Sequence, residues 1–491
     1  MVPQELIHYI MKKYLLLLLV VALSFTTAFA ADESTITIKT SKPVGTTVSL
    51  DAYTASKDEA FTVDWGDGEE KIYNVDPNGW GYSRRIKTEI KGGTITIKGK
   101  LVNFDLTEAG ITSVDLHGQT ALKIINLKEN EIATFKQDGM PALTELNLRD
   151  NKLTTFSGTG MTSLKTLNLQ GNQLDSHEFD ITDASATLTD LTVSNNGDKF
   201  ITLNLMAFTA LEYFYCDDNP EFTTAVFADN NANIKKISMN NCHVMHFYSC
   251  TFPNLYSLNL SNNALLDLEE GNYPKLSTLS IDHNYLTALD VTRFPKLESL
   301  YCGNNNITLL NVGNNPGLLS LNCDSLGITK LDISNNKDLA YLSVNGTKLT
   351  QLDIRGKRSI TTLNISNTAI RYIDLEDQYS LRDFRARNTQ CEFFYFNYIN
   401  PWGRFNYVDI RDNKKMTGNS MNFTLHTIPQ AYSDYSNSLL IAGSNGETAD
   451  TEYATSQDMK WKCDVTGDGT AKNEAVKVTV DGTDTGERVS G

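Results

Sequence analysis

The stretch "CHVMHFYSC", residues 242–250, gathers side chains of the types that bind transition metals. Cys242, His243, His246 and Cys250 offer two thiols and two imidazoles, a common ligand set of a tetrahedral zinc site. Such a site requires four ligands that converge on one point. Whether these four can converge depends on the local structure that carries them.

A second stretch, "DVTGDGTAKNEA" at residues 464–475, has the appearance of a calcium-binding loop. Its candidate ligand positions are Asp464, Thr466 and Asp468, followed by Gly469. The acidic residue near its end, Glu474, stands one place too early for the final ligand, and no helix pattern follows. A glycine-rich turn is the better interpretation, and no calcium is expected there.

No catalytic motif is found in the remaining sequence. The chain contains no nucleophile elbow, zinc-protease helix motif or phosphate-binding loop, and none of its seven histidines has a fixed carboxylate partner in the sequence. The adjacent carboxylates of Asp217 and Asp218 are interpreted as solvated surface groups. We therefore expect no enzymatic activity and no cofactor.

The candidate ligands lie within a chain that repeats itself, mostly every 21 residues. In "LESLYCGNNNITLLNVGNNPG", residues 297–317, the apolar spacing fits neither a helix nor a continuous alternating strand, and residues 318–338 repeat it. Fifteen units begin at Leu101, Leu122, Leu143, Leu164, Leu188, Leu211, Ile234, Leu255, Leu276, Leu297, Leu318, Leu339, Ile360, Leu381 and Phe405.

Each unit is predicted to form one coil of a β-rich solenoid. In "LESLYC", positions 1, 4 and 6 are expected to point inward, whereas Glu298, Ser299 and Tyr301 point outward. The short strand of one coil then pairs in parallel with the next at about 4.8 Å. A single coil cannot bury its leucines, but a stack makes them a continuous core. The far side of each coil is left with short extended or 3₁₀ segments.

The repeat frame separates the four candidate zinc ligands. Cys242 falls in an inward position, His243 and His246 point outward, and Cys250 lies in the turn before the next coil. Ligands that face different ways cannot form a tetrahedron, so no metal is expected. Cys216, Cys302 and Cys323 fall at leucine positions and are predicted to be buried, unpaired thiols.

The ninth position of the unit is mostly asparagine. Asparagine stands at Asn130, Asn151, Asn172, Asn196, Asn219, Asn263, Asn284, Asn305 and Asn413, and other residues at Ala109, Cys242, Leu326, Thr347, Thr368 and Thr389. An inward asparagine can donate to turn carbonyls that would otherwise be buried without a partner. We interpret this asparagine column as structural. The outward residue before each asparagine, such as Asp150, is expected to tolerate alanine.

The pattern L-x-x-L-x-L-x-x-N-x-L, written here as "LTELNLRDNKL", "LYSLNLSNNAL" and "LSTLSIDHNYL", resembles the leucine-rich repeat family over about residues 101–415. Units such as "LTALDV" and "ITKLDIS" look like the short repeats of internalin-like bacterial surface proteins. The resemblance implies a curved right-handed coil with parallel strands on its concave face. "VDWGDG" resembles the hairpin of small PKD-like β-modules.

The chain divides into four predicted segments. Residues 1–30 read as a signal peptide, with the apolar run "YLLLLLVVAL" and a small-x-small site before Ala31; Met11 is an alternative start. Residues 31–100 are expected to form a small β cap domain, residues 101–428 a solenoid of about fifteen repeats, and residues 429–491 a C-terminal cap and polar tail. A membrane anchor is less consistent with the first segment, because the run is shorter than about 20 residues.

The net charge and the predicted export restrict the classes of partner that the chain can bind. The net charge of −16 argues against nucleic acid, because phosphate binding needs a basic face. No later segment is apolar for the length of a membrane span. We expect an exported protein (secreted, periplasmic or associated with the cell surface), monomeric, that binds a protein or a glycan. A structural spacer without a ligand of its own is the alternative.

Outward strand positions distinguish these two roles, because binding surfaces concentrate tyrosine and arginine. Most coils offer small polar residues there, such as Asn147, Asn168, Ser280 and Ser343. Against this background stand Tyr213, Tyr215, Lys236, Tyr301, Tyr341, Arg382, Arg385, Arg387, Tyr407 and Arg411. These ten residues, here called the Tyr/Arg patch, are predicted to contact the ligand. The alternative is that the arginines merely offset nearby carboxylates such as Asp383 and Asp409.

Overall fold

The computed structural model describes residues 34–56, 58–75, 83–248, 250–396 and 407–416, with Thr424, Thr427 and the main chain of 437–442, 463–465 and 475–480. The predicted signal peptide, the unit start at Phe405 and most of the calcium-type stretch lie outside these residues. Two compact units, Met1–Phe200 and Ile201–Gly491, are each described on their own.

The first unit begins with a β-module whose strands alternate buried and exposed side chains. Its strands are β1 (Thr35–Thr40), β2 (Thr47–Thr54), β3 (Ala60–Asp64), β4 (Glu70–Asn74), β5 (Ser83–Glu89) and β6 (Thr94–Lys98). β6 pairs antiparallel with both β1 and β3, and β3 pairs with β4. The β3–β4 hairpin turns at "GDG", where Asp64 Oδ1 accepts the amide protons of Gly66 at 2.8 Å and Gly68 at 3.0 Å.

This β-module continues directly into the first coil. β2 pairs antiparallel with β7 (Leu101–Asp105), and β1 pairs antiparallel with β8 (Ile111–Asp115). Trp65 in the β-module and Phe104 on β7 are each about 1% exposed. The open end of a solenoid needs a cover of this kind. β5 was not expected from the sequence, because among its residues with described side chains, Arg84–Glu89, only Ile86 is buried.

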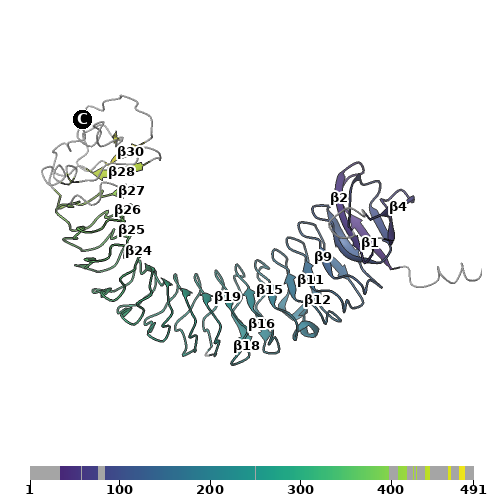
Figure 1. Ribbon diagram of the computed structural model, residues 1–491, viewed down its shortest axis with the longest axis horizontal. Coiled ribbons are helices and arrows are strands. Elements are labelled where there is room, and N and C mark those ends of the chain that lie inside the picture. The colour runs from purple at the N-terminus through teal and green to yellow at the C-terminus, as the bar shows by residue number, and fades with distance from the viewer. Residues whose placement is uncertain are drawn as a thin grey trace, which may run out of the picture. The chain divides into compact units, whose positions relative to one another are not determined.

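The coils of the first unit stack their strands in parallel (Figure 1). One layer holds β7, β9 (Ile124–Asn126), β11 (Glu145–Asn147), β13 (Thr166–Asn168) and β15 (Asp190–Thr192). On the other side of the coils lie β8, β10 (Thr134–Lys136), β12 (Phe156–Ser157), β14 (Phe179–Asp180) and the 3₁₀ turns η1 (Ser176–Glu178) and η2 (Thr182–Ala184). The predicted short extended and 3₁₀ segments are present on that side.

The second unit repeats the arrangement. Its main layer holds β17 (Tyr213–Tyr215), β19 (Lys236–Ser238), β20 (Ser257–Asn259), β21 (Thr278–Ser280), β22 (Ser299–Tyr301), β23 (Ser320–Asn322), β24 (Tyr341–Ser343), β25 (Thr362–Asn364), β26 (Asp383–Arg385) and β27 (Tyr407–Asp409). The remaining strands are the parallel pair β16 (Thr202–Leu205) and β18 (Thr224–Phe227), followed by β28 (Asn437–Ala442), β29 (Cys463–Val465) and β30 (Ala475–Val480). β28 pairs parallel with β27, and β30 pairs antiparallel with β28 and β29.

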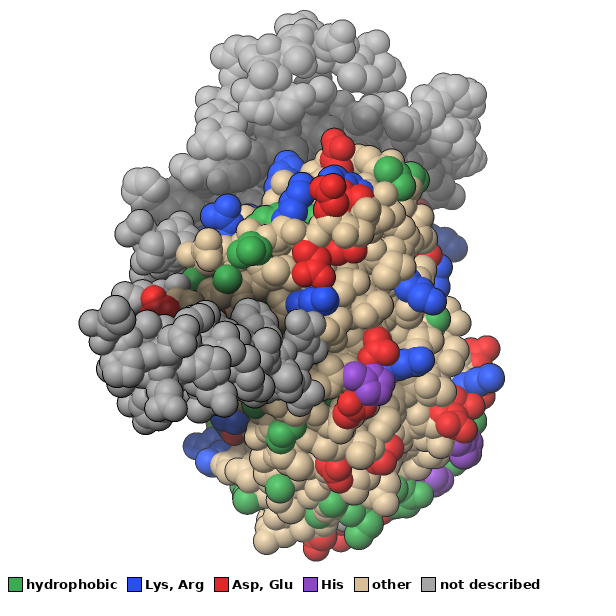
Figure 2. All heavy atoms as spheres, turned by 90° about the vertical axis from the view of Figure 1, so that its right-hand side faces the viewer, with side chains coloured by type: hydrophobic (Ala, Val, Ile, Leu, Met, Phe, Trp, Pro, Cys, Tyr) green, Lys and Arg blue, Asp and Glu red, His purple; other side chains and the backbone are tan. Residues whose placement is uncertain are grey.

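The predicted inward positions are buried. In the coil "LESLYC", Leu297, Leu300 and Cys302 are 0% exposed, whereas Glu298 is exposed. Cys216 and Cys323 are equally buried, and both are unpaired, as predicted. In the view of Figure 2, acidic and basic side chains are interspersed over the described surface and hydrophobic ones are scattered. The apolar side chains are therefore used mainly in the core.

The asparagine column lies inside the coil and connects it to its neighbour. Asn151 Nδ2 donates to the carbonyls of Leu148 in its own coil at 2.9 Å and Leu127 in the preceding coil at 3.0 Å. Its Oδ1 accepts the amide proton of Ile132 at 2.9 Å. Asn172, Asn263, Asn284 and Asn305 make the same three bonds in their coils. One side chain thus satisfies three main-chain groups.

The residue before the column adopts a left-handed conformation. The non-glycine residues at this position have φ between 51° and 60°. They are Glu108, Glu129, Asp150, Asn195, Asp218, Asn241, Asn262, His283, Asn304, Ser325, Asn367, Asn388 and Asp412. A left-handed φ is unfavourable for residues that carry a Cβ, although less so for asparagine and aspartate, whereas glycine adopts it readily. The expectation that Asp150→Ala is silent is therefore wrong.

We expect Asn151→Ala to lower the free energy of unfolding by about 1–3 kcal/mol, because it leaves buried carbonyls and an amide without partners. Thr155→Ala, at an exposed position of the same coil, should change it by less than about 0.5 kcal/mol. Urea unfolding of the purified chain measures both values. Equal shifts for the two variants would contradict the structural role of the column.

The left-handed position is tested within the same experiment. Asp150→Ala should cost about 1 kcal/mol more than Asp150→Gly, because only alanine carries the steric penalty. Both changes remove the Asp150 Oδ2 to Arg149 Nε contact of 2.9 Å, so their difference isolates the backbone conformation. A glycine variant no more stable than the alanine variant would exclude this explanation.

Candidate functional site

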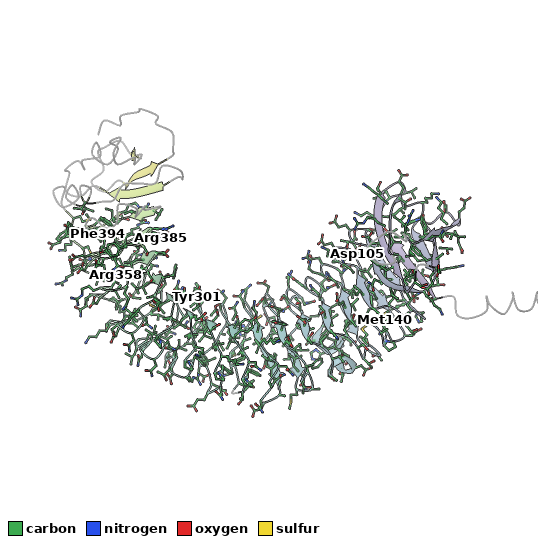
Figure 3. The ribbon with its side chains drawn as sticks, in the orientation of Figure 1. Asp105, Met140, Tyr301, Arg358, Arg385 and Phe394 are labelled. Carbon is green, nitrogen blue, oxygen red and sulfur yellow. The ribbon has the colours of Figure 1, made fainter. Side chains whose placement is uncertain are left out.

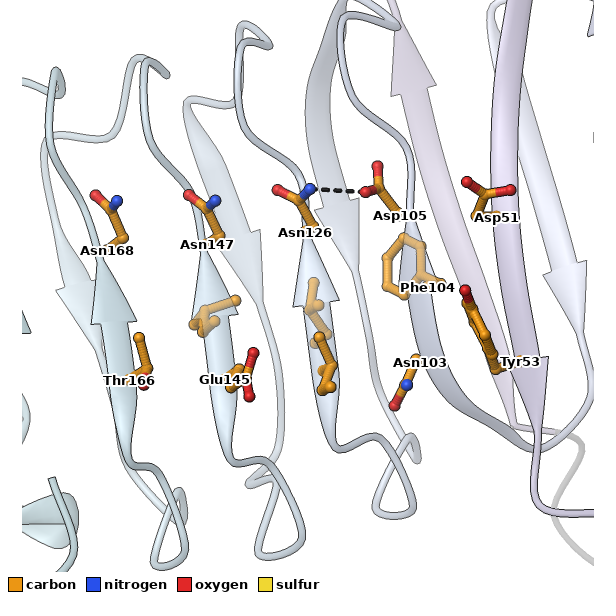
Figure 4. A pocket seen from close by; sticks show the side chains of 13 residues that line it. Asp51, Tyr53, Asn103, Phe104, Asp105, Asn126, Glu145, Asn147, Thr166 and Asn168 are labelled. Carbon is orange, nitrogen blue, oxygen red and sulfur yellow. Dashed lines mark hydrogen bonds between the residues drawn. The ribbon is translucent and has the colours of Figure 1, made fainter. Parts of the chain in front are cut away.

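The strand layer of the first unit carries a hollow of about 440 Å³. Its walls come from β2, β7, β9, β11 and β13, and they include Asp51, Tyr53, Asp105, Asn126, Glu145 and Asn147 (Figure 4). The repeat side chains that face it stand at the third and fifth positions of the unit, on either side of the buried fourth position. We call this cavity the strand-face hollow.

Three asparagines in consecutive coils point their amides across the hollow in the same way. Asn126, Asn147 and Asn168 each accept, through Oδ1, the amide proton two residues further on, at 3.4, 3.1 and 3.0 Å. With the oxygen fixed, Nδ2 is the free donor of each amide. Asn126 donates to Asp105 Oδ2 at 2.7 Å (Figure 4). For Asn147 and Asn168, Nδ2 has no acceptor among the described residues.

The hollow also contains three carboxylates in different states. Asp51 is neutralised by Arg85, whose Nε and Nη2 each donate to it at 2.8 Å. Asp105 accepts from Thr107 and Asn126 and makes no ion pair within 4 Å with a described residue, although Arg85 acts on it at longer range. Glu145 makes no ion pair with any described residue. The hollow therefore presents unused donors and acceptors side by side.

The Tyr/Arg patch lies on the strand layer of the second unit, as its outward positions require. Lys236 stands over the ring of Tyr215 with Nζ 5.1 Å from the ring centre, and Tyr213 is its strand partner. Tyr301 lies on β22 and Tyr341 on β24, with β23 between them. Figure 3 shows Tyr301 and Arg385 on the strand side of the coils. These tyrosines are therefore dispersed along the layer.

Three of the four arginines of the patch are already paired with carboxylates. Arg385 Nε and Nη2 both donate to Asp383 at 3.0 Å, and its guanidinium stacks 4.9 Å from the ring centre of Tyr407. Arg411 donates to Asp409 at 2.8 and 2.6 Å. Arg387 Nε lies 2.5 Å from Asp412, and Arg382 is exposed beside the strand. These contacts favour the alternative in which the arginines offset local charge.

Two carboxylates of the strand layer are partly buried. Asp324 accepts from Ser343 Oγ at 2.5 Å and from the amide of Asn345 at 2.8 Å, and burial raises its pKa. Asp217 accepts from Ser238 Oγ at 2.6 Å, and burial raises its pKa as well. The interpretation of Asp217 as a solvated group is wrong, because the next coil covers it. Both carboxylates hold adjacent coils together.

The strand-face hollow was missed from the sequence. Asp51 and Tyr53 belong to the β-module and join the strand layer only through the β2–β7 pairing. Asn147 and Asn168 were treated as background, although the recurring asparagine at the fifth position was the available signal. Hydrogen-bond direction, which makes these asparagines donors, is a property of the folded coil.

Three comparisons place this architecture. A family model described as leucine-rich repeat matches residues 136–174, and no curated protein sequence matches the chain. The functional domain of InlJ from Listeria monocytogenes, described as including a cysteine ladder, superposes with a TM-score of 0.55 at 19% identity, covering 81% of this chain and 88% of its own.

Two further solved structures are similar over part of the chain. A leucine-rich repeat protein of Leptospira interrogans covers 55% of this chain and 72% of its own at 22% identity, with a TM-score of 0.45. An internalin, InlF from Listeria monocytogenes, covers 57% and 84% at 22% identity, with a TM-score of 0.45. The superposition on InlJ and the matched repeat model confirm the predicted fold class, a leucine-rich repeat solenoid with parallel strands.

No helix in the described part of the chain has the length and hydropathy needed to cross a bilayer.

The buried carboxylate predicts a pH effect. The pKa of Asp324 is raised above about 3.9 in the folded state, so the native state loses stability as the pH rises through the two values. Asp324→Asn does not titrate, and we expect it to gain stability relative to the natural chain between pH 3 and pH 7. Urea midpoints across this range measure the difference.

Asp353 supplies the opposite sign. Its ion pair with Arg355 lowers its pKa to about 2, so its stabilising effect is present at neutral pH and is lost as the pH falls through that value. Asp353→Asn should therefore be less stable than the natural chain at pH 7, with a gap that closes toward pH 2. If the stability of both variants relative to the natural chain changed with pH in the same direction, the raised pKa of Asp324 would be refuted.

Proposed function

We propose that this chain is an exported, non-catalytic recognition scaffold that binds a protein or glycan partner through its strand face. The internalin-like form of its repeats supports a bacterial surface or secreted role, and the signal-type segment at residues 11–30 supports export. Under this proposal residues 31–100 and 429–491 act as caps for the repeat region, residues 101–428. The chain needs no cofactor for this role.

The observation that carries the proposal is the unused hydrogen-bonding capacity of the strand-face hollow. Asn147 and Asn168 present amide donors, and Glu145 presents an acceptor beside them. A hollow that holds polar groups in fixed directions and has an aromatic ring elsewhere in its wall, here Tyr53 on β2, is characteristic of sites that orient a ligand. Sugar hydroxyls and extended main chain both donate and accept, so either kind of partner matches this arrangement.

The Tyr/Arg patch contributes a second contact surface under the same proposal. Its tyrosines are half-buried and retain some exposed area, and the Arg385 guanidinium lies over the Tyr407 ring. Because its arginines are compensated by Asp383, Asp409 and Asp412, the patch offers less net charge than the sequence suggested. We therefore give the hollow the leading role.

A structural spacer is the second candidate. The dispersed tyrosines and self-paired arginines of the second unit favour it, because a spacer has no need for uncompensated groups. The hollow argues against it, because the Nδ2 donors of Asn147 and Asn168 and the carboxylate of Glu145 make no hydrogen bond or ion pair with a described residue. The two candidates differ in whether any ligand is bound at all.

We expect the mature chain to capture a ligand on a glycan array, or in a pull-down from an extract of the cell-surface molecules that it meets in its natural environment. Glu145→Ala combined with Asn147→Ala should weaken the binding roughly 30-fold, because two hydrogen bonds of about 1 kcal/mol each are lost. The matched control, Arg385→Glu with Tyr407→Ala, should weaken it less.

Each outcome of this experiment is informative. Equal capture by the natural chain and the hollow variant would move the site away from the hollow. A stronger loss in the control than in the hollow variant would assign the ligand to the Tyr/Arg patch. No captured ligand in either assay would favour the spacer.

A further inference from the structure

Three potential metal ligands meet on the side of the coils opposite the strand layer. His246 and Asp267 occupy equivalent places in adjacent coils, 21 residues apart, and His246 Nδ1 lies 3.6 Å from Asp267 Oδ1. Glu269 follows two residues later, and one ligand atom from each residue lies within 4.8 Å of the others. We call these three residues the outer triad.

We propose that the outer triad binds one zinc ion. In a tetrahedral site with bonds of about 2.0–2.1 Å, two ligand atoms lie about 3.3–3.4 Å apart, close to the observed separation of His246 and Asp267. Three protein ligands leave the fourth position for water. This site lies away from the strand face and is independent of the proposed recognition function.

The ligand types select the metal. Calcium and magnesium prefer sites built from oxygen ligands alone, whereas an imidazole nitrogen suits zinc. The two carboxylates of Asp267 and Glu269 supply two negative charges, which balance the charge of the ion. Neither Cys242 nor Cys250 belongs to this group of converging ligand atoms, so no thiolate is included in the proposed site.

Both segments of the triad are anchored from behind. Next to His246, Phe247 is buried and packs against Tyr273, which stacks between Phe252 and Phe294. In the next coil, Arg293 donates to the main-chain carbonyls of Leu268 at 2.9 Å and Glu269 at 3.1 Å. The guanidinium thus fixes the turn that carries the carboxylates. Such support orients ligands before a metal arrives.

The hollow beside His246 adds an apolar wall. It measures about 280 Å³ and is lined by Val226, Phe227, Phe247 and Tyr248, with His246 at its edge. An apolar surface beside a metal limits competition from water and strengthens the interaction of the ligands with the ion. An isolated pair of surface carboxylates would lack this setting.

The structure revises the expectation that no metal binds here. The sequence was searched for ligands within one stretch, and that set fails because the Cys242 thiol is directed to the carbonyl of Cys216 at 3.2 Å. The triad instead combines one residue of that stretch with two from the following coil. The 21-residue repeat places equivalent positions of adjacent coils side by side. The triad could therefore be found by comparing these positions between successive units, and not by searching one continuous stretch.

The test is a zinc titration of the untagged mature chain by calorimetry. We expect one zinc ion per chain, and at least about tenfold weaker binding for His246→Asn and for Asp267→Asn. His283→Asn is the matched control, because His283 faces the single carboxylate of Asp282 at 2.8 Å and should leave zinc binding unchanged. Unchanged melting of the zinc-free variants shows that each of them is folded.

Other outcomes would overturn the proposal. Absence of saturable zinc binding refutes it. Equal binding by the natural chain and by the His246 and Asp267 variants shows an adventitious ion only. Calcium or magnesium binding as tight as that of zinc excludes the role given to the imidazole. A loss in the His283 variant as large as in the His246 variant places the ion elsewhere.

Discussion

The hydrogen bonds of the buried asparagine column, which occupies the ninth position in nine of the fifteen repeat units, are the interaction on which the rest of the structure depends. A chain that turns back on itself every few residues buries carbonyls and amides that no strand ladder satisfies. Asn263, for example, donates to Leu260 and Met239 and accepts from Val244, so one side chain closes three main-chain groups in two coils. Where threonine replaces it, as at Thr347 and Thr368, the hydroxyl reaches only the carbonyl three residues before it, at 2.7 Å.

This internal solution leaves the strand-face side chains available for other uses, and the two units use them differently. In the first unit, asparagine oxygens are fixed by the next turn while amide donors remain, as at Asn147 and Asn168. In the second unit, three arginines of the Tyr/Arg patch are paired with carboxylates, as at Arg385 with Asp383, and Asp324 accepts a hydrogen bond from Ser343 in the next coil. Coils built on the same repeat thus carry unused donors in the first unit and compensated charge in the second. The outer triad, on the side of the coils opposite the strand layer, also depends on the repeat, because equivalent positions in adjacent coils lie about 4.8 Å apart.

Periodicity explains which features the sequence could predict. The inward columns, the asparagine column and the unpaired cysteines recur at a fixed spacing, so position in the unit was enough to place them. The left-handed residue before each asparagine was missed because aspartate, asparagine, glutamate, histidine and serine all occur there. The hollow and the outer triad depend on neighbours from other segments: Asp51 meets Asn126 through the β-module, and His246 meets Asp267 across one coil. Strand β5 was missed because its pairing with β2, including Arg85 to Asp51, replaces hydrophobic alternation.

Hydrogen exchange in an asparagine variant tests most directly whether the column holds the stack. In a solenoid each coil contacts only its neighbours, so the effect of one lost side chain should remain local. Asn284→Ala removes the acceptor of the Leu265 amide and the donor to Leu260. Mass spectrometry should then show faster exchange in peptides from about residues 255–296, with protection elsewhere unchanged. Unchanged exchange at the Leu265 amide, or an even loss of protection along the whole chain, would contradict this account.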